Sequence, residues 1–258
     1  MQAKLRPNIQ LARRITAILL LFAGANGHLH AQATVSSEQI SFETAPLRGA
    51  GTTVRGELRL PDAGDGALPA VLVLHTSAGS SGDRISLHYI ERLNRAGIAT
   101  LRISMFADSV MSLVMASEEI VQEYTGGKAR FAAHLAVYPV CSAHLQILAG
   151  KNKVYGASTY EKVTGAPVHI LAGELDTYDE PDSCPRFVAA LPEGVRGHFG
   201  ATVYPGAHHV FDEPGASRQH REPIARNGMA IIRYNAEAAG KAWAFAEQFF
   251  TRHLAAKN

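Results

Sequence analysis

Hydrophobic and polar residues along the chain switch between two periods, which predicts strands interleaved with helices. Residues 39–46 and 52–61 are rich in strand-forming residues and flank Arg48-Gly49-Ala50-Gly51, a hairpin signature. Residues 69–75, PAVLVLH, form a continuous apolar run, which is typical of a parallel strand buried on both faces. A loop rich in glycine and serine follows this strand at 76–84.

The same alternation continues to the end of the chain. Helical periodicity predicts helices at 86–97, 108–127, 184–194 and 235–254. Strands are predicted between them at 98–106, 129–139, 166–174 and 200–206. Strands that alternate with helices predict an α/β fold with a mostly parallel, doubly wound sheet, in which sites lie at the carboxyl ends of the strands. No linker divides the chain, so we predict a single domain over 34–258.

The first 33 residues have the composition of a cleaved export signal. Four basic residues within 4–14 precede an apolar stretch at 15–25, and Ala31-Gln32-Ala33 offers a small-x-small cleavage site. The apolar stretch is shorter than the ~18 residues that a membrane span needs, which argues against an anchor. We therefore expect a signal peptide over 1–33 and a mature protein that is periplasmic or secreted.

Composition and charge narrow the class of function. The 258 residues are 47% hydrophobic and 19% charged, with a formal net charge of +2, which suits one well-buried domain. No basic run stands out beyond the N-terminus, so no nucleic-acid-binding face is expected. In an exported chain, the two cysteines Cys141 and Cys184 are expected to form a disulfide. Two buried free thiols, or a thiol nucleophile, are the alternatives.

Two polar residues lie just beyond predicted strands. Asp176 follows the strand at 166–174, and His209 follows the strand at 200–206, far enough along the chain for one intervening helix. Because the carboxyl ends of neighbouring parallel strands meet at one sheet edge, we expect these two side chains to lie together. An aspartate that accepts a hydrogen bond from an imidazole fixes its tautomer and leaves the other ring nitrogen to act as a general base.

Other residues in these two segments could take the same roles. His208 is an alternative base, and Asp179 or Asp182 is an alternative acid, although both aspartates lie further from the strand end. His208, His209 and Asp212 could also bind a metal ion together. Adjacent residues on an extended segment point to opposite sides, so two neighbouring histidines rarely reach one ion, and no metal is expected.

The chain resembles the dienelactone hydrolase family of the α/β-hydrolase superfamily. Five blocks carry the resemblance, in that family's order: PAVLVLHTSAG, AGIATLRI, FAAHLAVYPVC, ILAGELDTYDEPDSC and YPGAHHVFD. The resemblance covers nearly all of residues 38–254, and YPGAHHVFD is its most distinctive block. It implies an α/β-hydrolase fold, a small-molecule ester or lactone as substrate and no cofactor. It further implies Asp176 as the triad acid, His209 as the triad histidine, and the amide of Thr76 or Ser77 as an oxyanion donor.

The motif that carries the family's nucleophile is missing from this chain. The family places G-x-S-x-G or G-x-C-x-G on a sharp strand-to-helix turn, and neither pattern occurs here. The predicted strand at 98–106 passes directly to the predicted helix. The family would have about forty to fifty more residues there, enough for a further strand and helix. We interpret this as an internal deletion, with residues 102–110, RISMFADSV, at its site.

Ser109 is the candidate nucleophile that the shortened segment offers. In ADSVM (107–111) it takes the serine position of the motif, but Met111 stands where glycine would let helix and strand approach. Ser109 or Asp108 could instead cap the following helix. Cys141 follows a different strand from the one that carries the family's nucleophile, so it is not favoured for this role.

The sequence therefore leaves three functional hypotheses. The first is an exported serine hydrolase that acts on an ester or lactone by a nucleophile-His-Asp mechanism, with the nucleophile degenerate or lost. The second is an inactive relative that binds a small acyl compound or a protein partner. The third is a chain without a stable fold, because loss of a central strand would remove buried contacts.

Overall fold

The computed structural model describes residues 35–43, 53–62, 67–75, 83–104, 111–152 and 156–255. All of them belong to one unit that spans 33–258. The predictions for the export signal, Thr76, Ser77 and Ser109 fall outside the described residues. Among the described residues, no helix has both the length and the apolar character that crossing a membrane requires.

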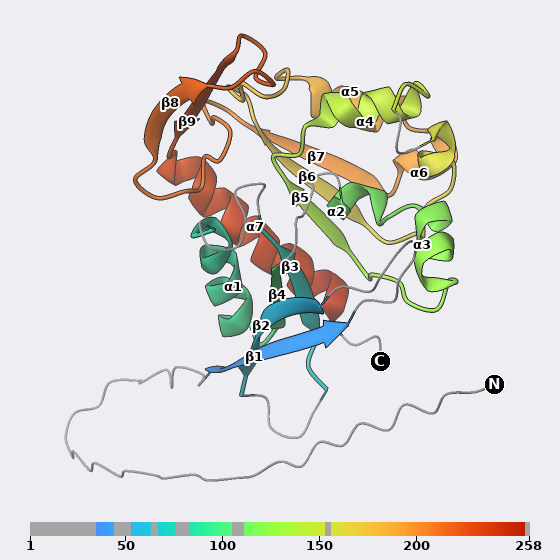
Figure 1. Ribbon diagram of the computed structural model, residues 1–258, viewed down its shortest axis with the longest axis vertical. Helices are drawn as coiled ribbons and strands as arrows, with labels where there is room; N and C mark the ends of the chain where they lie inside the picture. Colours follow the sequence, from blue (N-terminus) through green and yellow to red (C-terminus); the bar gives the residue numbers. More distant parts are fainter. Residues whose placement is uncertain are drawn as a thin grey trace. The chain divides into compact units, whose positions relative to one another are not determined.

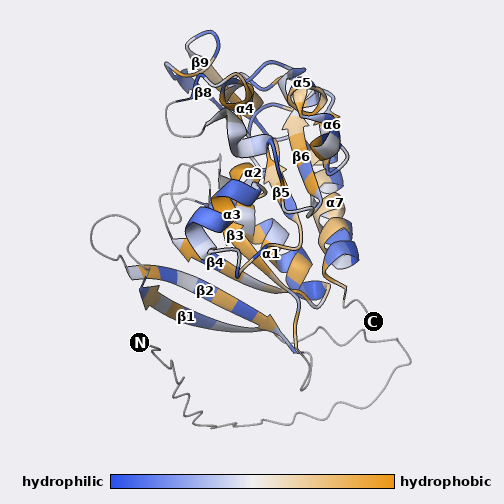
Figure 2. Ribbon diagram, turned by 90° about the vertical axis from the view of Figure 1, so that its right-hand side faces the viewer, coloured by the Kyte–Doolittle hydropathy of each residue, from blue (hydrophilic) through white to orange (hydrophobic). Residues whose placement is uncertain are grey.

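The first sheet has four strands in the order β1-β2-β4-β3 (Figure 1). In that order they are β1 (Val35–Glu43), β2 (Thr53–Pro61), β4 (Ala99–Ser104) and β3 (Ala70–Leu74). β1, β2 and β4 pair antiparallel, which confirms the predicted hairpin, and β3 pairs parallel to β4. α1 (Ile85–Arg95) makes the crossover that a parallel pair requires. Apolar and polar residues alternate along β1 and β2, which Figure 2 shows as stripes.

The second sheet is entirely parallel, in the order β5-β6-β7. Its strands are β5 (His134–Val137), β6 (Val168–Gly173) and β7 (Phe199–Tyr204). Four helical segments belong to this part: α4 (Cys141–Leu148), the 3-10 helix η1 (Ala157–Tyr160), α5 (Ser183–Ala190) and α6 (Glu193–Arg196). β6 is central and almost wholly buried, as expected for a parallel strand that is covered on both faces.

The predicted single helix over 108–127 is wrong in its described part. The segment forms two shorter helices, α2 (Met111–Val114) and α3 (Glu118–Thr125). A new helix begins after Ser117, because the Ser117 hydroxyl accepts a hydrogen bond from the Ile120 N–H and so caps α3. The predicted helix at 184–194 is likewise divided into α5 and α6, with Pro192 as the N-cap of α6.

A two-stranded hairpin was not predicted from the sequence. It consists of β8 (Ser217–Arg221) and β9 (Met229–Arg233), which pair antiparallel. The one local signal is the dipeptide Asn227-Gly228 just before β9, where Gly228 has a φ of +66° that glycine adopts without strain. The chain then enters α7 (Ala236–Leu254), which confirms the helix predicted over 235–254. Its N-cap Asn235 accepts a hydrogen bond from the Ala238 N–H.

The described strands of the two larger sheets are not hydrogen-bonded to each other. Among the described strands, β3 pairs only with β4, and β5 pairs only with β6. α7 packs against both sheets (Figure 1): Phe250 lies against the apolar cluster that includes Val71 of β3, and the Phe245 ring centroid is 4.3 Å from that of His169 on β6. The α/β class is thus confirmed, and the internal deletion stays a prediction at the boundary between the sheets.

We expect Phe249→Ala to lower the free energy of unfolding by about 3 kcal/mol, because it removes a buried ring from the face of α7 that joins the sheets. Phe249 is 9% exposed, and its ring packs against Phe245 and Phe250. Urea unfolding followed by circular dichroism measures the change. Phe42→Ala, which removes an exposed ring from β1, is the control. Equal stability of the two variants would contradict the role of α7.

Candidate active site

The carboxyl ends of β5, β6 and β7 lie at the same edge of the second sheet. The register pairs Val137 with Leu171 and Gly173 with Tyr204, so the three strands end close together. The loops that leave this edge carry Asp176 after β6 and His209 after β7. This is the juxtaposition that the strand pattern predicts.

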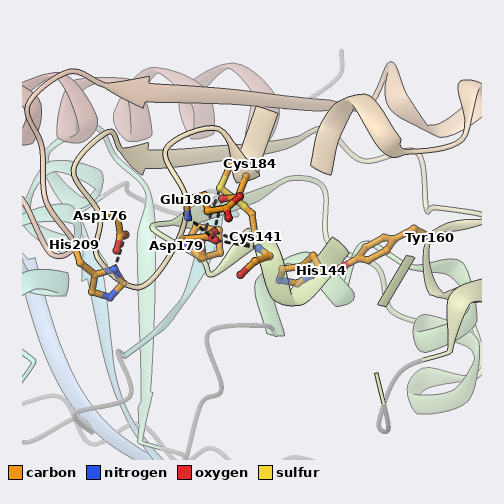
Figure 3. Close-up of a disulfide and its surroundings, with 11 residues drawn as sticks. Cys141, His144, Tyr160, Asp176, Asp179, Glu180, Cys184 and His209 are labelled. Atoms are coloured by element: carbon orange, nitrogen blue, oxygen red, sulfur yellow. Dashed lines mark hydrogen bonds and ion pairs between the residues drawn. A yellow bond between two sulfur atoms is a disulfide. The ribbon is translucent and has the colours of Figure 1, made fainter. Parts of the chain in front are cut away.

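His209 and Asp176 form a direct hydrogen bond. The Nδ1 atom of His209 lies 2.7 Å from Oδ2 of Asp176 (Figure 3). Asp176 is only 4% exposed, and its other oxygen, Oδ1, accepts from the Tyr178 N–H at 2.8 Å. With an ionised Asp176, the Nδ1 atom carries the proton, and Nε2 is left as the basic nitrogen. The pair therefore has the tautomer and orientation that a general base needs.

Two tyrosine rings hold the imidazole of His209. The Tyr138 ring lies edge-on with centroids 4.9 Å apart, and the Tyr178 ring is tilted with centroids 4.4 Å apart. Tyr138, directly after β5, has a φ of +41°, and Val210, directly after His209, has a φ of +56°. Neither residue is a glycine, so both backbones are strained, and both strained positions adjoin the imidazole. The sequence predicted none of these contacts, because an aromatic residue after a strand carries no specific signal.

Glycine allows the two loops to approach each other closely. A Cβ on Gly173, at the end of β6, would lie 2.4 Å from the carbonyl oxygen of Ala207. The Leu175 N–H donates to the same carbonyl at 2.8 Å. Gly206 has a φ of +66°, and its N–H donates to the Glu174 carboxylate at 2.9 Å. The glycines of the AGE and YPGAHH segments thus fix the separation of the loops that carry acid and base.

Asp212 is a second carboxyl group beside the site. It is fully buried, and its Oδ2 accepts a hydrogen bond from the Tyr89 hydroxyl of α1 at 2.5 Å. Its Oδ1 has no hydrogen-bond partner among the described residues. Burial raises the pKa of Asp212 to about 6, although the Tyr89 hydroxyl and the nearby imidazole of His209 oppose the rise. Burial and the charge of Asp212 in turn raise the pKa of the Tyr138 hydroxyl well above its usual value.

The alternative acids are engaged elsewhere. The Asp179 carboxylate accepts from the Ser142 N–H at 3.3 Å and from the Ser183 hydroxyl at 2.5 Å, at the N-termini of α4 and α5. Asp182 is exposed and lies 3.3 Å from the Arg186 guanidinium. Neither side chain occupies the place at the imidazole that Asp176 takes. The alternative base, His208, keeps Nδ1 buried without a hydrogen-bond partner among the described residues, and burial lowers its pKa.

The expected disulfide is present in the structure. Cys141 and Cys184 are joined with their Cα atoms 5.0 Å apart, and both residues are buried (Figure 3). Neither sulfur is therefore a free thiol or a nucleophile in this state. The bond ties the start of α4, which follows β5, to the start of α5, which follows the loop of Asp176.

The described residues that could bind a metal ion together are not the histidines His208 and His209. Within the described part of the chain, three such atoms lie together at one place, formed by Cys141, Asp179 and Cys184. The disulfide occupies both sulfurs there, which leaves one carboxylate. His208, His209 and Asp212, which were considered as ligands, do not form such a group.

Comparisons with known proteins agree with this architecture. A sequence model of the dienelactone hydrolase family matches residues 118–254, just over half of the chain. No match is found among curated proteins. A putative dienelactone hydrolase from Klebsiella pneumoniae subsp. pneumoniae has a similar structure, with 16% identity, a TM-score of 0.50, and coverage of 83% of this chain and 99% of that one.

Two further solved structures are similar to the same extent. Est1E from Butyrivibrio proteoclasticus matches with 14% identity and a TM-score of 0.51, over 84% of this chain and 99% of that one. The dienelactone hydrolase-like promiscuous phosphotriesterase P91 from metagenomic libraries matches with 14% identity and a TM-score of 0.50, over 84% and 98%. At these identities the likeness shows the fold alone, which is that of the α/β-hydrolases.

We expect Asp212→Asn to change how stability depends on pH. The carboxyl group has a pKa of about 6 in the folded state and about 3.8 when unfolded. As the pH rises through this range, the unfolded state loses its proton first, so the wild type loses up to about 3 kcal/mol of stability between pH 4 and 6. Asparagine keeps an acceptor for Tyr89 and removes this dependence.

The measurement is urea unfolding of both proteins at pH 4, 5, 6 and 7. The stability of Asp212→Asn relative to the wild type should increase with pH and level off above pH 6. A difference between the two proteins that stays constant over the whole range would show that Asp212 has an ordinary pKa.

Proposed function

The chain belongs to the dienelactone hydrolase family, and on that premise we propose that it hydrolyses a small ester or lactone with His209 as general base and Asp176 as its partner. Hydrolysis of small-molecule esters is the activity of the family. The observation that carries the assignment of the two residues is the 2.7 Å hydrogen bond from Nδ1 of His209 to buried Asp176.

The proposed reaction is a two-step acyl transfer. Nε2 of His209 takes the proton of a nucleophilic hydroxyl as its oxygen attacks the ester carbonyl carbon. The imidazolium, stabilised by Asp176, then gives this proton to the departing alkoxide, and an acyl-enzyme remains. Water repeats the sequence: its proton passes to His209, its oxygen attacks the acyl carbon, and the nucleophile regains its hydrogen as the carboxylic acid leaves.

We propose Ser109 as the nucleophile, in a degenerate form of the family's motif. Its support is the order of the chain, in which Ser109 precedes Asp176 and His209 and follows β4, as in α/β-hydrolases. The backbone amides of Thr76 and Ser77, which follow β3, are the corresponding oxyanion donors. All three residues lie outside the described ranges, so the proposal for them rests on sequence position.

A pseudo-hydrolase that binds a small acyl compound or a protein partner is the second candidate. Two observations favour it. The first is that the G-x-S-x-G motif is absent from the sequence. The second is that β3 and β5 belong to separate sheets in the described part of the chain. In the family, the strand that carries the nucleophile would stand between these two strands. If the chain is a pseudo-hydrolase, Asp176 and His209 are retained without a nucleophile for them to activate.

Covalent labelling with a fluorophosphonate and burst kinetics with p-nitrophenyl acetate separate the two candidates. We expect labelling at Ser109, located by peptide mass spectrometry, and its loss in Ser109→Ala. His209→Ala and Asp176→Asn should lower kcat by about 10³- to 10⁴-fold, because the base is lost or held in the wrong tautomer. Ser112→Ala is the control, since its hydroxyl donates to the Leu135 carbonyl away from the pair.

The outcome that sinks the catalytic proposal is a chain that melts cooperatively yet neither takes the label nor turns over the ester. Phenyl acetate that then binds this chain, but not the Ser109→Phe variant, would support the pseudo-hydrolase. Label on a serine other than Ser109 would retain the hydrolase and overturn the choice of nucleophile.

We also propose that the chain is exported to the periplasm or beyond. The basic and apolar N-terminal segment supports export, and so does a buried disulfide, which persists in an oxidising compartment. Expression of the full chain in a Gram-negative host, followed by fractionation and mass spectrometry, should yield a periplasmic protein that begins at Thr34. An uncleaved protein in the cytoplasmic fraction would contradict this.

A further inference from the structure

The β8–β9 hairpin contacts both loops that carry the Asp176–His209 pair. The Ile231 N–H of β9 donates to the Thr177 hydroxyl oxygen at 3.1 Å, next to Asp176 in the chain. The adjacent residue, Ile232, forms a parallel β-bridge with His209. Consecutive residues of one strand therefore hold the loop of the acid and the loop of the base.

Further hydrogen bonds tie the acid's loop to the hairpin. The Arg226 N–H, in the connection between β8 and β9, donates to the Thr177 carbonyl at 2.9 Å. The Arg226 guanidinium also donates to the Asp176 carbonyl at 3.3 Å. Thr177 is thus held by the hairpin through both its carbonyl and its side chain.

β9 is itself firmly anchored, so it can act as a reference for both loops. Ala230 and Ile232 are buried, and Ile232 belongs to the same apolar cluster as Tyr204 and Phe211, which lie on either side of His209 in the chain. β8, in contrast, is exposed along its whole length. The strand that contacts the pair is the one that is packed into the core.

We propose that Thr177 is a positioning residue, which sets Asp176 against His209 by anchoring the acid's loop to β9. The proposal rests on the proposed function of that pair. In the contact with β9, the Thr177 hydroxyl oxygen is the acceptor and the backbone N–H of Ile231 is the donor. A substitution at Thr177 can therefore remove the acceptor while the donor stays in place. Without this acceptor the Ile231 N–H loses its partner, and the loop is released on one side. Of the hydrogen bonds described between the hairpin and the acid's loop, the two from Arg226 would then remain, and a small misplacement of a base is costly.

Two substitutions at Thr177 and one control test this role. Thr177→Val keeps the branched shape and removes the hydroxyl, and Thr177→Ser restores it. Thr202→Val is the matched control, because the Thr202 hydroxyl bonds to His169 at 2.9 Å on the same sheet, away from the pair. Thermal melts establish that each full chain is folded before activity is compared.

The first readout is the NMR signal of the Nδ1 proton of His209 in histidine-labelled protein, assigned by its loss in His209→Ala. A bond to a buried carboxylate slows the exchange of this proton. We expect the signal to be broadened or lost in folded Thr177→Val, and retained in Thr177→Ser and Thr202→Val. The second readout is hydrolysis of p-nitrophenyl acetate, where kcat of Thr177→Val should fall by about 10- to 100-fold, with KM within twofold of the wild type.

An unchanged proton signal in folded Thr177→Val overturns the proposal, and so does an equal loss in Thr202→Val or a failure of serine to restore the signal. The two readouts also separate this inference from the proposed function. If the wild type has no esterase activity but shows a slowly exchanging Nδ1 proton that Thr177→Val loses, the hydrolase proposal fails and the positioning role of Thr177 stands.

Discussion

Apolar contact along α7 is the constraint on which the rest of this structure depends. The described strands of the two larger sheets share no backbone hydrogen bonds, so side chains must hold the sheets together. α7 supplies a common surface: its alanines at 238 and 242 lie in the cluster around Leu171 of β6, and its last turns pack beside β3. Small residues let the helix approach closely, and the aromatic residues near its C-terminus fill the wider space.

The candidate site inherits this division between the sheets. The acid, the base and the hairpin that contacts both belong to the second sheet and to the segments that follow its strands, and the described residues bring them together. The proposed nucleophile and oxyanion amides follow strands of the first sheet. In the described part of the chain, a hydrogen bond from Tyr89 of α1 to Asp212 links the helix of the first sheet to this region. The relation of nucleophile to base therefore depends on packing between sheets, whereas that of acid to base depends on register within one sheet.

This division also explains which features could be predicted from the sequence. Asp176 and His209 follow apolar strands of regular pattern, so their meeting at one sheet edge follows from the parallel topology. The disulfide follows from two cysteines placed near that edge. The hairpin at 217–233 escaped prediction because β8, SRQHR, has no apolar face and owes its structure to pairing with β9. The break between α2 and α3 escaped because one hydroxyl cap at Ser117 outweighs a helical pattern that continues through it.

Backbone strain at the residues beside the His209 imidazole bears on the proposed function of the site. Tyr138 and Val210 hold left-handed backbones that cost of order 1–3 kcal/mol each. Among the described residues, these two are the non-glycine positions with a positive φ, and both adjoin His209. Relaxed turns at these two positions would serve the stability of the fold better. Strained backbones cluster at functional sites, and the position of these two beside His209 supports the proposal that this imidazole takes part in the protein's function.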